Sequence, residues 1–247
     1  MRPQPEQQAP PVQRLRVRYA KRGRARFTSH RDFSRAFERA VFRARVPMAY
    51  SSGFNPHPRI SYAGAAPTGS ASEAEYVEIA LAEVVDPAAV HASLAAALPD
   101  GLDLVEVVVS AGGSMADRLE ASCWRITLDG VDEARAREAV AQLLDTPEVE
   151  VERMTKKGLR RFDARAAVLT AAVRGEDPDR PGCAILDVVL RHGTPSVRPD
   201  DVLAALSKSS GLDVTAALQQ RLAQGPLDEA DGTVGDPLAP DRDAAPR

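Results

Sequence analysis

Aromatic residues are scarce in this sequence and make up 4% of its 247 residues. A core of ordinary size must therefore be built mainly from Ala, Val and Leu. Only two cysteines are present, Cys123 and Cys183, and neither has a closely spaced cysteine or histidine partner. This scarcity disfavours a disulfide framework, a zinc site or an iron–sulfur cluster within the chain. We expect two reduced thiols, and no metal or other cofactor held by this chain itself.

Long apolar runs are also missing. No stretch approaches the roughly 18 apolar residues that a membrane-spanning helix requires. The first thirteen residues contain no apolar segment of the kind found in secretion signals. We therefore expect a cytoplasmic protein that does not enter a membrane. The sequence also lacks a Walker loop, a dinucleotide-binding fingerprint and a nucleophile elbow, so the enzyme classes built on those motifs are not indicated.

The residues that are present predict an α+β fold of two tandem ferredoxin-like halves, each with the order βαββαβ. In the first half, residues 14–111, alternating apolar residues predict strands over 14–20, 59–63, 75–82 and 101–110. Helices are expected to begin at Ser29 and at Asp86, and Pro47 is expected to end the first of them.

The second half, residues 112–224, repeats this order less clearly. Strands are expected over 121–128, 149–154, 184–191 and 213–222, and helices over 131–144 and 199–207. Residues 156–174 interrupt the repeat. The N-terminal leader, residues 1–13, and the acidic C-terminal tail, residues 225–247, are rich in Pro and aperiodic, so we expect both to be disordered.

Charge and aromatic residues are concentrated in one part of the chain. Eight of the eleven Phe, Tyr and Trp residues lie between residues 19 and 62. Between residues 14 and 59, thirteen Arg or Lys residues face only two acids, Asp32 and Glu38, whereas the whole chain has a net charge of −3. This region is therefore the first candidate for a functional surface.

The helix expected after Ser29 would carry arginines at intervals of four on one face: Arg31, Arg35, Arg39 and Arg43. Like charges at this spacing repel by a few tenths of a kcal/mol per pair. An anionic ligand would relieve the repulsion, and guanidinium groups match phosphate well. The alternatives are a protein partner and an ordinary solvated helix face.

A stiff loop follows the helix, with the sequence AYSSGFNPHP over residues 49–58. Pro56 and Pro58 restrict the backbone and favour extended conformations at the residues before them. Tyr50 and Phe54 would then either be presented on the surface, where they could stack on bases, or fill the core. Both possibilities remain open from the sequence.

A second basic cluster lies in the second half and contains Arg153, Lys156, Lys157, Arg160, Arg161 and Arg165 around the single acid Asp163. If the halves pack with pseudo-symmetry, the two clusters could line one groove, which is a common location for ligands.

The first basic region also carries a long motif. It reads F-x-S-H-x-D-x-x-R from Phe27, then R-A-x-F-R-A-x-V-P-x-A-Y-S-x-G-F-N-P-H-P-R-I-S-Y-A from Arg39, then S-x-x-E-Y to Tyr76. It resembles a bacterial radical-SAM-associated domain family of unknown function, over about residues 14–222. Arg31 and Phe33 stand where aliphatic residues would be expected, and the segment Lys156-Lys157-Gly158 with Asp163 resembles a second, weaker block. The resemblance implies a radical SAM protein as partner, carrying an iron–sulfur cluster, S-adenosylmethionine and cobalamin.

These observations together predict a non-catalytic accessory module that binds an anionic substrate such as RNA or tRNA and presents it to a radical SAM partner. The predicted ligand-binding residues are Ser29, His30, Arg31, Arg35, Arg39, Tyr50, Ser51, Gly53, Phe54, Asn55, His57, Arg59, Lys156, Lys157 and Arg160.

Two alternatives remain. One is an RNA-acting enzyme with His30 or His57 as general acid or base, oriented by Asp32 or Asp163. The other is a protein-docking scaffold whose basic face is competed for by the acidic C-terminal tail.

Overall fold

The structure is a computed structural model that describes residues 7–155 and 158–244. The chain has an α+β fold and divides into two compact units. The first unit is Met1–Asp117 together with Pro237–Arg247, and the second is Arg118–Asp236. The expected boundary, between residues 111 and 112, did not include this return of the C-terminus to the first unit. No helix within the described residues is long and apolar enough to cross a membrane.

The first unit is built on a four-stranded antiparallel sheet with the order β4-β1-β3-β2. Because β3 pairs with both β1 and β2, it lies between the two strands that α1 connects. The elements follow the predicted order along the chain: β1 (Gln13–Lys21), η1 (Gly23–Phe27), α1 (His30–Arg43), β2 (Ile60–Ala63), β3 (Ala71–Leu81), α2 (Pro87–Ala95) and β4 (Leu102–Val109).

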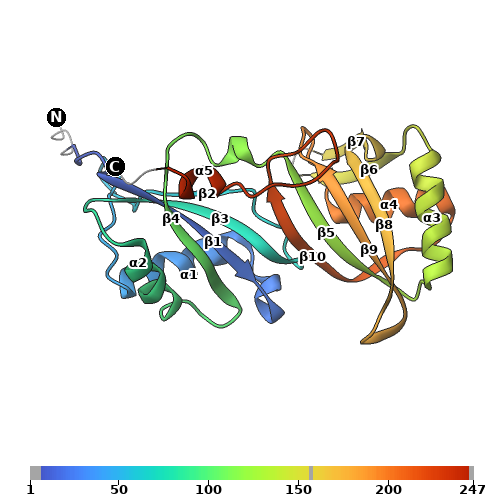
Figure 1. Ribbon diagram of the computed structural model, residues 1–247, viewed down its shortest axis with the longest axis horizontal. Helices are drawn as coiled ribbons and strands as arrows, with labels where there is room; N and C mark the ends of the chain where they lie inside the picture. The colour runs from blue at the N-terminus through green and yellow to red at the C-terminus, as the bar shows by residue number, and fades with distance from the viewer. Residues whose placement is uncertain (1–6, 156–157, 245–247) are drawn as a thin grey trace. The chain divides into compact units, whose positions relative to one another are not determined.

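Helices α1 and α2 cover one face of this sheet (Figure 1). Alternation along β1 directs Leu15, Val17 and Tyr19 into the core. There they pack with residues of both helices, including Phe33, which stacks on Tyr19 with 4.3 Å between ring centroids. The intervening side chain of Arg16 therefore points to the opposite face of the sheet.

The C-terminal segment occupies that opposite face, and the prediction of a disordered tail over residues 225–247 was wrong for its described part. A short helix, α5 (Ala239–Arg242), places Asp241 against the fully buried Arg16, with Nη1 2.9 Å from Oδ1. Leu238 is fully buried. Composition marks the segment as polar and aperiodic, but the buried Leu238 and ion pairs of Asp241 with Arg16 and of Arg242 with Glu106 attach it to the first unit.

The N-terminal leader lies partly outside the described residues. Within it, the Gln8 amide donates to Ser52 Oγ at 3.0 Å, and the Val12 amide donates to the Leu81 carbonyl at 2.9 Å. Strand β1 begins at Gln13, one residue before the expected start.

The second unit has a four-stranded antiparallel sheet with the order β10-β5-β9-β8, and a separate two-stranded sheet of β6 and β7. Helix α3 contacts α4, β8 and β9. The elements are η2 (Ala116–Arg118), β5 (Ala121–Asp129), α3 (Glu133–Asp145), β6 (Glu150–Thr155), β7 (Gly158–Asp163), η3 (Arg165–Ala167), β8 (Val168–Asp177), β9 (Arg180–Arg191), α4 (Pro199–Ser210) and β10 (Thr215–Gly225).

One strand of the second unit does not have the place that the sequence predicted. The strand expected over residues 149–154 was to be the second of the repeated pattern, but β6 pairs with β7 in a hairpin. Strand β8, from the segment regarded as an interruption, pairs with β9 instead. Burial along β8 does not alternate regularly, because its register with β9 shifts, so periodicity did not identify β8 as a strand of the main sheet.

Candidate functional site

Helix α1 begins where the sequence predicted. Ser29 precedes the first turn, and its Oγ accepts a hydrogen bond from the Asp32 amide at 3.2 Å and donates one to Asp32 Oδ2 at 2.7 Å. This N-cap satisfies a backbone donor that the helix itself leaves free. Phe33, Phe37, Ala40 and Val41 are buried, so the polar faces of the helix are turned to solvent.

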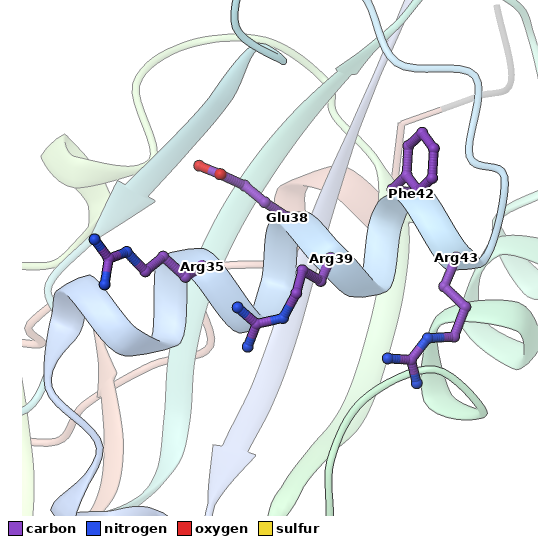
Figure 2. A pocket seen from close by; sticks show the side chains of 5 residues that line it. All are labelled: Arg35, Glu38, Arg39, Phe42 and Arg43. Carbon is purple, nitrogen blue, oxygen red and sulfur yellow. The ribbon is translucent and has the colours of Figure 1, made fainter.

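Two rows of side chains project from the exposed side of α1. Arg35, Arg39 and Arg43 extend along one side of the helix, and Phe42 projects on another (Figure 2). An open hollow of about 710 Å³ lies over these rows, lined by Arg35, Glu38, Arg39, Phe42 and Arg43. Three of the five lining side chains are cationic and one is anionic, so the hollow is positively charged.

The arginines of this region lack carboxylate partners. Eight arginines lie between residues 24 and 59, and within the described part of the chain none of them forms an ion pair: Arg24, Arg26, Arg31, Arg35, Arg39, Arg43, Arg45 and Arg59. Arg43 and Arg59 donate only to backbone carbonyls, those of Ala97 and Tyr50.

Several arginines elsewhere in the protein do have carboxylate partners. Arg14 and Arg16 on β1, and Arg22 just after it, are paired with acids. On exposed surfaces of the second unit, Arg137 is paired with Glu133, and Arg174 with Asp187. The cluster on and around α1 is therefore an uncompensated positive surface in a chain whose net charge is −3.

The loop after α1 is held closed at its base. The Ser51 amide donates to the His57 carbonyl at 2.9 Å, and the His57 amide donates to Ser51 Oγ at 3.0 Å. Arg59 Nε donates to the Tyr50 carbonyl at 3.0 Å. Gly53 has φ of 134°, a conformation that other residues rarely adopt. These hydrogen bonds fix the base of the loop, and its tip carries Phe54 into solvent.

Three aromatic side chains of this region are exposed to solvent. Phe42, Phe54 and Tyr50 are 83%, 69% and 40% exposed. None of the three contacts another ring among the described residues. Tyr50 and Phe54 therefore do not fill the core, and the surface alternative is the one observed.

A second hollow, also about 710 Å³, lies on the other side of the Glu38–Phe42 row. Its walls are largely apolar and include Tyr50 from the loop. Its lining residues are Glu38, Val41, Phe42, Arg45, Val46, Pro47, Met48, Tyr50 and Pro58. Apart from Tyr50, sequence analysis assigned none of these to the site. An arginine between the helix end and Pro47 was the signal that could have drawn attention to Arg45.

The histidines of the catalytic alternative lie at opposite ends of α1. His30 starts the helix and packs edge-on against Tyr62, with 5.0 Å between ring centroids. His57 belongs to the loop after its end. A helix of 14 residues spans about 20 Å, so the two rings do not share a site. Neither imidazole is hydrogen-bonded to a carboxylate within the described part of the chain.

The acids proposed to orient those histidines have structural roles instead. Asp32 caps α1 through Ser29. Asp163 accepts hydrogen bonds from the amides of Val149, Arg165 and Ala166, and so holds the turn that contains η3. The suggestion that either acid orients a catalytic histidine is therefore not supported by this geometry. No group of three or more His, Cys, Asp or Glu residues within the described ranges could hold a metal ion.

The second basic cluster belongs to the other unit. Arg153 donates to Asp201, Arg161 to Glu152, and Arg165 to the carbonyls of Val168 and Leu144. Arg160 is exposed on β7. Lys156 and Lys157 lie outside the described residues. Two of its four described arginines, Arg153 and Arg161, are thus ion-paired, and a shared groove with the first cluster stays a prediction.

Comparison with solved structures shows a likeness of fold alone. The chain is similar to one in the crystal structure of a Cbf5-Nop10-Gar1 complex, with a TM-score of 0.50 and 10% identity, over 91% of this chain and 56% of that chain. It thus spans little more than half the length of that chain. The first two RRM domains of yeast poly(U) binding protein (Pub1) give a TM-score of 0.22 at 10% identity, over 83% and 98% of the two chains, which is too distant to support an argument.

Sequence comparison gives the family. No curated protein matches the chain. A family model described as "Uncharacterized protein conserved in bacteria (DUF2344)" matches residues 14–199, which include the whole α1 region and both basic clusters. The chain is therefore a member of the DUF2344 family.

Proposed function

We propose that the exposed surface of α1 and the loop over residues 49–59 bind RNA, with tRNA as the leading candidate. The observation that carries this proposal is the set of arginines without carboxylate partners, set among exposed aromatic rings. Arginine forks bind phosphate oxygens bidentately, and aromatic rings stack on unpaired bases. A protein surface with both properties matches the two chemical parts of a nucleotide.

The energetics favour the same assignment. Arg31, Arg35, Arg39 and Arg43 form a row of like charges at i,i+4 spacing, which costs a few tenths of a kcal/mol per pair when nothing offsets it. Some exposed arginines of the second unit, Arg137 and Arg174, are ion-paired, whereas no arginine of the row on α1 is paired with an acid among the described residues. The phosphates of a bound RNA would offset the repulsion within this unpaired row of arginines.

The wider role is an accessory one. The module would present its RNA to a radical SAM protein that carries the iron–sulfur cluster, S-adenosylmethionine and cobalamin, and would itself hold none of them. Support for this partner comes from the sequence motif between Phe27 and Tyr76. We also propose that the two units represent a duplicated ferredoxin-like pattern, since each sheet places its strands in the same relative order.

The first test is binding of total tRNA to the purified chain at low salt, about 50 mM, where phosphate contacts are strongest. The double variant Arg35→Gln, Arg39→Gln should weaken binding roughly tenfold or more, because two charge-assisted contacts are lost. The matched control is Arg137→Gln, Arg174→Gln, which removes the same charge from ion-paired positions in the second unit.

Equal loss in both double variants would mean that only net charge matters and would exclude an RNA site on α1. Absence of tRNA binding by the unaltered chain, with capture of a radical SAM protein in a parallel affinity experiment, would instead make α1 a protein-docking face. In that case the RNA assignment would be abandoned.

A further inference from the structure

The hollow beside Phe42 and Tyr50 differs in character from the arginine-lined hollow next to it. Its walls are mostly apolar, formed by Val41, Val46, Pro47, Met48 and Pro58 with the two rings. Its charged residues, Glu38 and Arg45, are of opposite sign, so it has no net charge. A phosphate would gain little here, because the carboxylate of Glu38 offsets the guanidinium of Arg45. A flat, uncharged ring with polar edges would fit.

Arg45 is held in this hollow by an unusual backbone. Among the described residues it is the single non-glycine residue with positive φ, at 53°. It occupies the position just past the end of α1, where the Val46 amide donates to the Val41 carbonyl and the Arg45 amide to the Phe42 carbonyl. Glycine is the usual residue at this position of a helix end. An arginine kept there at an energetic cost suggests that its side chain is needed.

From these features we infer that the hollow between Phe42 and Tyr50 receives one unstacked base of a single-stranded RNA. The base would stack on the exposed ring of Phe42, with Arg45 as donor and Glu38 as acceptor for its edge. Bases present both donors and acceptors there, and single-stranded RNA is recognised mainly through splayed bases stacked on aromatic rings.

The two hollows then divide one nucleotide between them. They share Glu38 and Phe42 as a common wall. The phosphate would lie on the side of Arg35, Arg39 and Arg43, and the base on the side of Arg45 and Tyr50. This inference rests on the proposed function but goes further, since phosphate binding alone requires only the first hollow.

The test compares two labelled oligomers of equal length and charge by fluorescence anisotropy. One is an unstructured single-stranded RNA, and the other is the same ribose-phosphate chain without bases. We expect the unaltered protein to bind the RNA about fivefold or more tightly than the abasic chain, the range typical of one stacked base. Phe42→Ala should remove this difference without changing affinity for the abasic chain.

Arg39→Gln serves as the matched control, because it should weaken binding of both oligomers by the same factor. Phe42 is largely exposed, so its replacement should not affect folding, and an unchanged thermal midpoint would verify this. Equal affinity of the unaltered protein for RNA and abasic chain would overturn the base-binding inference while leaving phosphate binding intact. Binding of neither oligomer would overturn both.

Discussion

Arg45 allows the demands of folding and of ligand binding to be separated at a single residue. At the end of α1 it adopts φ of 53°, where a side chain with a Cβ atom is strained and glycine is not. Arg45 at the same time lines the hollow beside Tyr50. The backbone conformation favours glycine, whereas the hollow uses arginine. We therefore expect a substitution by glycine to affect stability and binding in opposite directions.

We predict that Arg45→Gly raises the free energy of unfolding by up to about 1 kcal/mol, because the strain of the left-handed conformation is removed. The same change should weaken RNA binding severalfold, since a donor of the hollow is lost. Urea unfolding and anisotropy measure the two effects. Arg45→Ala is the control: it removes the same guanidinium but keeps the strain, so it should weaken binding without the gain in stability. A gain in stability with unchanged affinity would remove Arg45 from the site.

Single residues also show how far sequence reasoning reached into the site. The helix cap at Ser29 and the four-residue spacing of the arginines along α1 follow local rules, and both were predicted correctly. Whether Tyr50 and Phe54 faced solvent could not be predicted, because aromatic residues are equally compatible with a core. The hollow around Arg45 depends on the approach of the loop to the helix end, which no local pattern encodes.

At the scale of elements, local patterns predicted most helices and strands to within a few residues. What they could not assign was pairing. The alternation of β8 is interrupted by register shifts, and only the tertiary structure shows that β8 pairs with β9 while β6 pairs with β7. The prediction for the C-terminal segment was wrong for a related reason. One of its main contacts is with Arg16, which lies 225 positions away in the sequence.

The contact between α5 and the sheet gives a strong prediction about stability. Arg16 is fully buried, and it donates to both carboxylate oxygens of Asp241, at 2.9 and 3.0 Å, and to the carbonyls of Gly112 and Gly113. Asp241 also accepts from the Ala111 amide at 2.8 Å. Asp241→Ala would leave the buried guanidinium with Glu78, 3.0 Å from its Nε, as its remaining counter-charge and would remove two hydrogen bonds, a change expected to cost about 1–3 kcal/mol.

Denaturant unfolding of Asp241→Ala against Asp243→Ala provides the comparison. Asp243 lies two residues away in the same segment but is exposed, so its replacement should change stability by no more than about 0.5 kcal/mol. If the two variants were equally stable, the segment would not be fixed by this ion pair. The same contact argues against the tail as a competitor for α1, because the sheet of the first unit separates Asp241 from that helix.

At the scale of the whole molecule, the distribution of charge over the surface matters more for RNA binding than the net charge. The chain carries a net charge of −3 and a pI of about 5.9, so it should be repelled by nucleic acid at long range. Binding must then come from the local surface on α1, where positive charge is uncompensated. Such binding is expected to be steeply salt-dependent, because each phosphate contact releases condensed counterions.

This expectation can be made quantitative with the single-stranded oligomer. A plot of log affinity against log salt should be linear, and each phosphate contact should contribute about 0.7 to its slope. Arg39→Gln should therefore make the slope shallower by about 0.7, and Arg35→Gln, Arg39→Gln by about twice that amount. Arg137→Gln removes an equal charge from an ion-paired position and should shift the line without changing its slope. If Arg39→Gln left the slope unchanged, α1 would not contact phosphates, whatever the affinity. The slope depends on the number of phosphate contacts, whereas a change in net charge alone shifts the affinity.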